Sequence, residues 1–174
     1  MNKVISLLVF LIGILTVIDV GYNSTNIYEF KLYIPTYDIL TKEHKKEIDC
    51  LSRNIYREAS GEKEEGMTAV ALVTMNRTKA TGYPNTVCKV VHQKRNAVCQ
   101  FTWVCMRKLS LIDKEIYNYS RYVAIRVFFN HYLMNDITQR ALFYHANYVN
   151  PRWNNLVVTT IIGNHIFYKT PGEI

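Results

Sequence analysis

The chain has 174 residues, of which 49% are hydrophobic, and a formal net charge of +7. This length predicts one domain with a substantial core, and the charge predicts an anionic partner: a cell wall, an anionic lipid or a nucleic acid. Because the chain has no Lys/Arg-rich block and no nucleic-acid-binding motif, we expect no binding to nucleic acid.

Residues 1–21 are predicted to be a targeting segment. Lys3 precedes an apolar run of fifteen residues, from Val4 to Ile18, which Asp19 closes. This length fits the core of a signal peptide and is short for a membrane span. No cleavage site of the A-x-A type follows. A cleaved signal peptide and an uncleaved signal-anchor that contacts the membrane therefore both stay open, and either predicts export to the periplasm or cell envelope.

Residues 22–40 are predicted to be an extended linker, and residues 41–174 the main domain. Apolar residues alternate from Tyr28 to Ile34, which favours a short strand or an extended segment laid on the domain before Pro35.

The first predicted helix begins at Thr41, an N-cap with an acid in the following turn. Ile48, Leu51 and Ile55 recur at helical spacing and mark its buried face. Glu58 falls on the same face near the helix end, where the helix dipole disfavours a carboxylate by ~0.3–1 kcal/mol. Partial burial also favours the neutral acid, which general-acid cleavage of a glycosidic bond requires. The alternative is an exposed Glu at a frayed helix end.

A turn at residues 60–62 leads to a second predicted helix, from Glu64 to about Arg77. It is apolar on nearly every side, which predicts a central, buried helix. A short helix capped by Thr86 is expected after the following loop, with Val87, Val90 and Val91 facing inward.

Four cysteines lie in the main domain: Cys50, Cys88, Cys99 and Cys105. An even number in an exported protein favours disulfides. Four cysteines permit three pairings, among which the sequence does not decide, although a bridge between Cys99 and Cys105 would pin the loop between them. A zinc site is the rival interpretation, but no C-x-x-C spacing supports it.

Ser110 and Asp113 predict a capping box for a long helix that reaches about Leu133. Residues 141–146, 156–162 and 165–168 are then rich in aromatic and β-branched residues. A turn signal, Gly163-Asn164, separates the last two, so we predict a small antiparallel sheet. The fold class is α+β, with a mainly helical N-terminal part and a small C-terminal antiparallel sheet.

Many of these residues are shared with one family. The chain resembles the SleB/CwlJ family of bacterial cell-wall hydrolases, in order, over most of Cys50 to Tyr168. The resemblance rests on Asn54–Glu62, Gly66, Ala69–Val70, Asn76–Arg77, Pro84, Val90–Val91, Gln93, Cys99–Trp103, Ala141–Ala146, Pro151–Trp153 and Ile162–Tyr168.

The resemblance implies a lysozyme-like or lytic-transglycosylase-like catalytic domain over residues 41–174, with peptidoglycan glycan strands as substrate. Glu58 matches the position of the family's catalytic glutamate. The sequence departs from the family at Ser60, where Arg is common, and at Met106-Arg107, where Asp-Gly is common. Both departures bear on substrate contacts.

The number of carboxylates bears on the mechanism. Retaining and inverting glycosidases need a second carboxylate, as nucleophile or as base. Beyond Gly66 the acids are confined to helix starts, a polar loop and the C-terminus, which leaves Glu62 as the nearby candidate, in a supporting role. One essential carboxylate fits a lytic transglycosylase, in which Glu58 protonates the leaving oxygen and then helps the sugar's own hydroxyl to attack.

Aromatic, amide and hydroxyl side chains are predicted to line the cleft, because aromatic faces pack against sugar rings. With Glu62, the expected substrate-binding residues are Gln100, Phe101, Thr102, Trp103, Tyr144 and His145. Core packing is the alternative for each aromatic. His145 and His165 could bind a metal, but hydrogen-bonded structural histidines are the more common case. We expect no metal, no cofactor and a monomer.

Together these features predict an exported enzyme that cleaves peptidoglycan at the MurNAc–GlcNAc bond, for wall remodelling or for phage lysis. A zinc-dependent N-acetylmuramoyl-L-alanine amidase and a non-catalytic wall-binding module are the rival functions.

Overall fold

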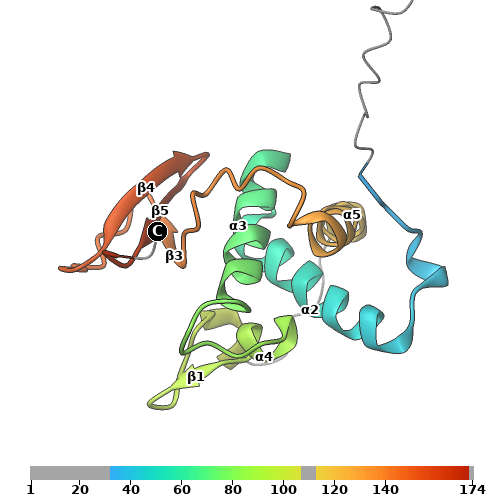
Figure 1. Ribbon diagram of the computed structural model, residues 1–174, viewed down its shortest axis with the longest axis horizontal. Helices are drawn as coiled ribbons and strands as arrows, with labels where there is room; N and C mark the ends of the chain where they lie inside the picture. The colour runs from blue at the N-terminus through green and yellow to red at the C-terminus, as the bar shows by residue number, and fades with distance from the viewer. Residues whose placement is uncertain (1–31, 107–112, 173–174) are drawn as a thin grey trace, which may run out of the picture. The chain divides into compact units, whose positions relative to one another are not determined.

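The computed structural model describes residues 32–106 and 113–172, and its main elements run in the predicted order, helices first and the larger sheet last (Figure 1). An antiparallel two-stranded hairpin at residues 94–99, before the last helix, was not predicted. These residues belong to one compact unit that starts at Leu32. Its elements are η1 (Tyr37–Ile39), α2 (Lys42–Ala59), α3 (Glu64–Arg77), α4 (Val87–Val91), β1 (Lys94–Arg95), β2 (Val98–Cys99), η2 (Thr102–Cys105), α5 (Lys114–Asn130), β3 (Phe143–Ala146), β4 (Val157–Ile162) and β5 (His165–Lys169).

Helix α2 begins and ends where the sequence predicts. The Thr41 side chain accepts a hydrogen bond from the His44 N–H, which satisfies one of the free donors of the first turn. Ile48, Leu51 and Ile55 are fully buried. The predicted apolar face is therefore the face that α2 turns toward the core.

Helix α3 is the central element, as its composition predicts. All but three of its fourteen residues are buried, and it packs against α2, α4, α5 and strand β4. In Figure 1 it lies between the C-terminal sheet and helix α5. Small residues of α3 such as Ala69 and Ala71 face these neighbours, so the backbones of the neighbouring elements can approach α3 closely.

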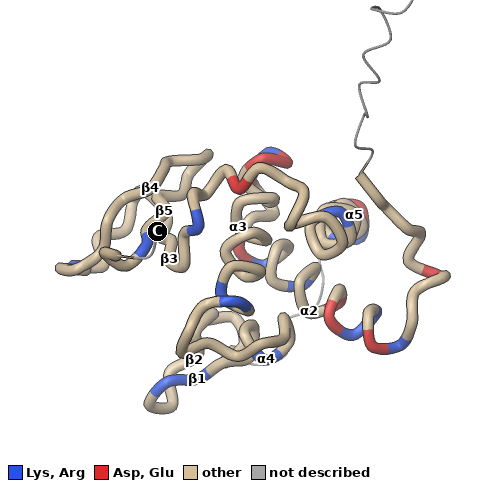
Figure 2. The backbone as a smooth tube through the Cα atoms, in the orientation of Figure 1, with Lys and Arg blue, Asp and Glu red and all other residues tan. Residues whose placement is uncertain are grey.

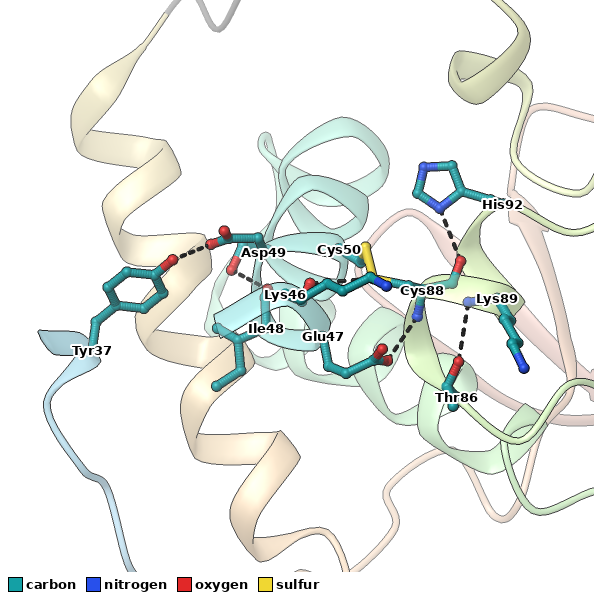
Figure 3. Close-up of a disulfide and its surroundings, with 11 residues drawn as sticks. Tyr37, Lys46, Glu47, Ile48, Asp49, Cys50, Thr86, Cys88, Lys89 and His92 are labelled. Carbon is teal, nitrogen blue, oxygen red and sulfur yellow. Dashed lines mark hydrogen bonds between the residues drawn. A yellow bond between two sulfur atoms is a disulfide. The ribbon is translucent and has the colours of Figure 1, made fainter. Parts of the chain in front are cut away.

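Two disulfides confirm the expected oxidised cysteines, and all four cysteines are used: Cys50 pairs with Cys88, and Cys99 with Cys105. The first joins α2 to α4, where the Glu47 carboxylate also accepts a hydrogen bond from the Cys88 N–H (Figure 3). The second closes the loop that carries η2. Thr86 caps α4 as predicted, by accepting from the Lys89 N–H.

Helix α5 begins later and ends earlier than predicted. Asp113 is itself the N-cap, and its carboxylate accepts from the N–H groups of Glu115 and Ile116. The predicted start at Ser110 lies outside the described residues. The helix ends at Asn130, whose side-chain amide hydrogen-bonds the backbone of Tyr33 in both directions. This contact lays Leu32–Ile34 on the domain as an extended segment, without strand pairing in the described part.

The C-terminal sheet has the order β3-β5-β4 and is antiparallel throughout, as predicted. Gly163, the first residue of the β4–β5 turn, has a φ of +56°, which glycine adopts readily in a type II′ turn. Tyr144 and Phe167 are register partners, as are Phe143 and Tyr168. Since neighbours along a strand alternate between faces, Tyr144 and Phe167 share the inner face, while Phe143, His145 and Tyr168 share the outer one.

The core has two parts. The larger lies among α2, α3, α4 and α5, and the smaller joins α3 to the sheet through Ala69, Val73, Ala141, Ile162 and Phe167. Among the described residues, no helix combines the length and the apolar character that crossing a bilayer requires. The predicted targeting segment, residues 1–21, lies outside the described part.

Candidate active site

Glu58 lies in the last turn of α2, half-buried at the junction between the helices and the sheet. Burial raises the pKa of its carboxyl group, while a hydrogen bond from Tyr144 and the charge of Arg77 lower it, and burial prevails. The group therefore retains its proton to a higher pH than an exposed glutamate does. A carboxylic acid with a raised pKa can act as a general acid near neutral pH.

Tyr144 reaches Glu58 from the inner face of β3. Its hydroxyl donates to Glu58 Oε2 over 3.3 Å. The ring is held by His165, perpendicular to it at 5.3 Å between centroids, and by Phe167 at 5.7 Å. Burial raises the pKa of Tyr144 well above its ordinary value, so the hydroxyl stays a donor.

Arg77, at the end of α3, is the cation of the site, and sequence reasoning assigned it no role. Its side chain is only 3% exposed, and Nε donates to the Leu142 carbonyl over 2.7 Å. The guanidinium lies over the ring of Phe101 at 5.3 Å. Within the described chain its Nη1 has no hydrogen-bond partner. The buried charge therefore acts on Glu58 and Tyr144 through a poorly screened interior.

Trp103 lies beside the same face of α2. Its indole N–H donates over 3.2 Å to Asn54, and the Asn54 amide in turn donates to Thr74 in α3. Asn54 is one helical turn before Glu58, so this contact sets η2 next to the turn that carries the acid. The Cys99–Cys105 disulfide closes the η2 loop.

The other predicted residues of this loop lie in different environments. Phe101 is 4% exposed and packs in the larger core beneath Arg77. Gln100 is half-buried, and its N–H donates to the Gln93 carbonyl over 2.9 Å. Thr102 is exposed at the start of η2. Substrate contact by each of these residues stays a prediction.

The Glu62 side chain is hydrogen-bonded to the β4–β5 turn. Its carboxylate accepts from the Asn164 N–H and from the Asn164 side-chain amide, the latter over 3.0 Å, and Oε1 lies 3.8 Å from His165 Nδ1. Burial lowers the pKa of His165 and outweighs the opposite effect of Glu62, so this histidine is neutral near pH 7. Glu62 therefore ties the sheet to the turn after α2.

His145 lies on the opposite face of β3 from Tyr144. Its Nδ1 bonds the Ala146 carbonyl over 2.9 Å, and its Nε2 bonds the Tyr168 hydroxyl over 2.7 Å. The structure thus brings together Glu58, Tyr144, Arg77 and Phe101. Trp103 contacts α2 one helical turn before Glu58, and His145 lies on the opposite face of the sheet. Alternation along β3 is the sequence signal that separates His145 from Tyr144.

A cavity of about 510 Å³ opens beside the turn that follows Glu58. Its lining includes Ser60, Met67 and Tyr119. Tyr119 and Tyr122 form an exposed stacked pair on α5, with ring centroids 5.9 Å apart. Sequence reasoning missed this pair, although their spacing of three residues on a predicted helix places both on one side of it.

Several other acids that the structure describes near these elements have structural partners, while Glu115 lines the cavity beside the α2–α3 turn. Glu64 binds Arg126 and Tyr119, and Asp49 accepts from the Tyr37 hydroxyl. Asp113 caps α5, and Asp136 accepts from the backbone of Thr138 and Arg140. Within the described residues, no cluster of three or more His, Cys, Asp or Glu side chains has the arrangement of a metal site.

Similarity to known proteins identifies the family. Residues 61–168 match the cell wall hydrolase family, a range that begins three residues after Glu58. The catalytic domain of the germination-specific lytic transglycosylase SleB from Bacillus anthracis is 29% identical, with a TM-score of 0.54 over 72% of this chain and 95% of that one. The catalytic domain of the Bacillus cereus SleB protein is 28% identical, with a TM-score of 0.53 over 72% and 91%. No curated protein sequence matches.

These matches confirm the predicted α+β fold and the predicted resemblance, since both solved structures are SleB catalytic domains. The family match covers more than half of the chain. The chain therefore belongs to the cell wall hydrolase family, as a SleB-like member.

Proposed function

We propose that this protein is an exported enzyme that degrades peptidoglycan by cleaving the MurNAc–GlcNAc bond as a lytic transglycosylase, with Glu58 as its catalytic acid. The observation that carries the proposal is the environment of Glu58. Burial raises the pKa of this half-buried carboxyl group, while the hydrogen bond from Tyr144 and the buried charge of Arg77 partly offset that rise. One of the similar structures is named a lytic transglycosylase, which supports the same reaction.

In the first step, protonated Glu58 donates its proton to the glycosidic oxygen as the bond to the muramyl anomeric carbon breaks. Positive charge develops on the sugar ring, and Glu58 becomes a carboxylate. The Tyr144 hydroxyl and the Arg77 charge favour that carboxylate, which is why both lower the pKa of Glu58. The site is thus poised between the two protonation states that the reaction needs.

In the second step, the Glu58 carboxylate takes the proton of the muramyl C6 hydroxyl as its oxygen bonds the anomeric carbon. This returns Glu58 to its acid form and gives a 1,6-anhydro ring without consuming water. Because nucleophile and electrophile belong to one sugar, the reaction gains the high effective molarity of an intramolecular attack. No second catalytic carboxylate is required, and Glu62, Glu64 and Asp113 serve structural contacts.

The proposed substrate contacts at the Glu58 site are Glu62, Gln100, Phe101, Thr102, Trp103 and Tyr144, in a catalytic domain over residues 41–174, whereas His145 faces the other side of β3. The cavity beside the α2–α3 turn and the Tyr119–Tyr122 pair offer further surface for sugar rings. Two disulfides support export, since such bonds persist in oxidising compartments.

Product analysis on purified peptidoglycan tests the proposal. Mass spectrometry should find anhydromuramyl-terminated fragments, which are lighter by one water than hydrolytic products, and chelators should not change the rate. Reducing-end muropeptides would instead identify a hydrolase with a second acid. Intact glycan with freed stem peptides, together with chelator sensitivity, would identify a zinc amidase. Binding to sacculi without any cleavage would identify a wall-binding module.

A further inference from the structure

The outer face of the C-terminal sheet carries a pocket that the catalytic proposal does not use. It has a volume of about 530 Å³, within the ~300–1,000 Å³ typical of small-ligand sites. Two aromatic rings, an imidazole and several polar side chains form its lining: His145, Asn150, Pro151, Arg152, Trp153, Asn154 and Tyr168. Since His145 and Tyr144 point to opposite faces of β3, this pocket and the Glu58 site lie on different faces of the sheet.

The hydrogen bonds of His145 determine what Tyr168 offers to a ligand. A carbonyl oxygen can only accept, so His145 Nδ1 must carry the proton that bonds the Ala146 carbonyl. In the neutral imidazole Nε2 is then an acceptor, and the Tyr168 hydroxyl donates to it over 2.7 Å. Because the Tyr168 proton is used in this way, its oxygen can only accept from a ligand, such as a sugar hydroxyl or an acetamido N–H.

Trp153 is fixed in place by three rings. It lies 5.4 Å from His145 and 5.5 Å from Tyr168, nearly perpendicular to both, and 5.9 Å from Phe143. It nevertheless remains 42% exposed. A rigid, partly exposed indole costs little side-chain entropy on binding and suits the apolar face of a pyranose ring.

Arg152 adds a positive charge to the pocket. It is exposed and has a φ of +52°, which is costly for a residue with a Cβ. The Asn150 side chain supports this conformation by accepting from the Arg152 N–H over 3.3 Å. Among the residues that the structure describes, no carboxylate lies within ion-pair distance of its guanidinium. The charge is therefore available to an anionic ligand, and guanidinium binds carboxylates in a bidentate manner.

We infer that this pocket is a second glycan-binding site, which takes an amino sugar that carries a carboxylate. The sugar ring packs on Trp153, its hydroxyl or amide donates to Tyr168, and its carboxylate pairs with Arg152. The assignment rests on the proposed function in that peptidoglycan is the source of the sugar. Two carboxylates of that polymer fit: the lactyl group of a muramyl residue without its peptide, and the termini of the stem peptide.

Titration of the full-length Glu58→Gln chain, labelled with 15N, tests the site without cleaving the probe. The probes are GlcNAc-MurNAc, the same disaccharide with a tetrapeptide, and chitobiose, which has no carboxylate. The two tryptophan indole N–H signals report separately on the two regions, since Trp103 is bonded to Asn54 beside α2. We expect saturable shifts of the Trp153 indole and of the His145 and Tyr168 amides with a carboxylate-bearing probe.

Variants in the same background identify the contacts. Trp153→Ala should weaken binding of the carboxylate-bearing probe at least tenfold, while Tyr148→Ala, in the same loop and 85% exposed, should not. Arg152→Gln should weaken it at least fivefold and leave chitobiose unaffected, whereas Lys89→Gln, which removes an exposed charge on α4, should change neither. Trp153→Phe provides a second test if the alanine variant does not fold.

The outcomes are distinct. If Arg152→Gln weakens binding of the peptide-bearing probe alone, the carboxylate belongs to the stem peptide. If it weakens binding of the bare disaccharide, the carboxylate is the lactyl group. Shifts at Trp103 alone, or equal affinity of all three probes in every variant, would overturn the second site. Because the Glu58→Gln chain cleaves nothing, this result is independent of product analysis: a wild-type enzyme that frees stem peptides would overturn the proposed bond and leave the pocket intact.

Discussion

The helical part and the C-terminal sheet contribute to the candidate site in different ways. Helices α2, α3, α4 and α5 share the larger core, which positions Glu58 and Arg77 on rigid elements. The sheet has only a small buried cluster against α3, and it supplies Tyr144, whose hydroxyl bonds the acid. Basic residues occur in both parts, on α2, α5, the β1–β2 hairpin and the sheet (Figure 2).

Few polar contacts hold the sheet against the helices. Arg77 donates to the Leu142 carbonyl, Asn76 donates to the Ala141 carbonyl, and Glu62 accepts from Asn164. Substitutions in the two parts should therefore have different effects on stability and activity. Damage in the helical core should unfold the protein, whereas damage at the junction should alter the surroundings of Glu58 with a smaller loss of stability.

The largest expected effect concerns the disulfide in the helical part. Replacing both Cys50 and Cys88 with Ala opens a loop of 38 residues and should cost about 4 kcal/mol of unfolding free energy by the chain-entropy relation. The matched change of Cys99 and Cys105 opens a loop of 6 residues and should cost about 2 kcal/mol. Urea denaturation measures both. Equal losses would contradict the view that the α2–α4 link stabilises the core.

Gly163→Ala tests the junction. An added Cβ would lie 1.9 Å from Glu62 Oε2, and the φ of +56° alone costs Ala about 1–2 kcal/mol. We expect a total loss of about 2–3 kcal/mol, since overpacking adds at least about 1 kcal/mol. In a Glu62→Ala background the same change should cost only the backbone part. An undiminished cost there would show that Glu62 does not contact this turn.

Tyr144→Phe tests the contact between the sheet and the acid. The hydroxyl bond lowers the pKa of Glu58, so its loss should raise that pKa further. Activity needs the protonated acid and falls as pH rises through this pKa, so the basic limb of the pH–rate profile should move to higher pH. Loss of one hydrogen bond to the carboxylate should also reduce kcat roughly tenfold. A limb that moves to lower pH would contradict the arrangement.

The smallest expected effect is on stability at Glu58 itself. Burial raises the folded-state pKa above the unfolded value, so the carboxyl group favours folding at low pH, and this contribution is lost as pH rises through the folded pKa. Glu58→Gln should therefore melt at a higher temperature than the parent at neutral pH. The gain should vanish below the unfolded pKa of about 4. A gain that grows on acidification would show that the folded pKa is lowered instead.

Local patterns predicted much of the fold. The spacing of Ile48, Leu51 and Ile55 located the buried face of α2 and put Glu58 on it. The uniform apolarity of residues 64–77 identified the central helix, and the Gly163-Asn164 turn located the sheet. Each of these signals depends on neighbours within a few residues, which is why a single sequence suffices for them.

Contacts between distant residues could not be predicted in this way. The cysteine pairing depends on how α4 meets α2, and four cysteines allow three arrangements. Arg77 looks like an ordinary basic residue at a helix end, because its contacts with Leu142 and Phe101 arise only when sheet and loop have packed. Period-two alternation separates Tyr144 from His145, but only the packing on α3 reveals which of them faces inward.

The most direct test of the account compares Glu58→Gln with Glu62→Gln in a peptidoglycan-lysis assay. Both changes remove one carboxylate near the same turn, and both proteins must first be shown to be folded by circular dichroism. If Glu58 is the single catalytic acid, its variant should lose at least ~100-fold in rate, the lower bound for removing a general acid. Glu62→Gln should mainly lower the melting temperature, because Glu62 holds the Asn164 turn. A folded Glu58→Gln protein with substantial activity, or equal losses of activity in both variants, would contradict the account.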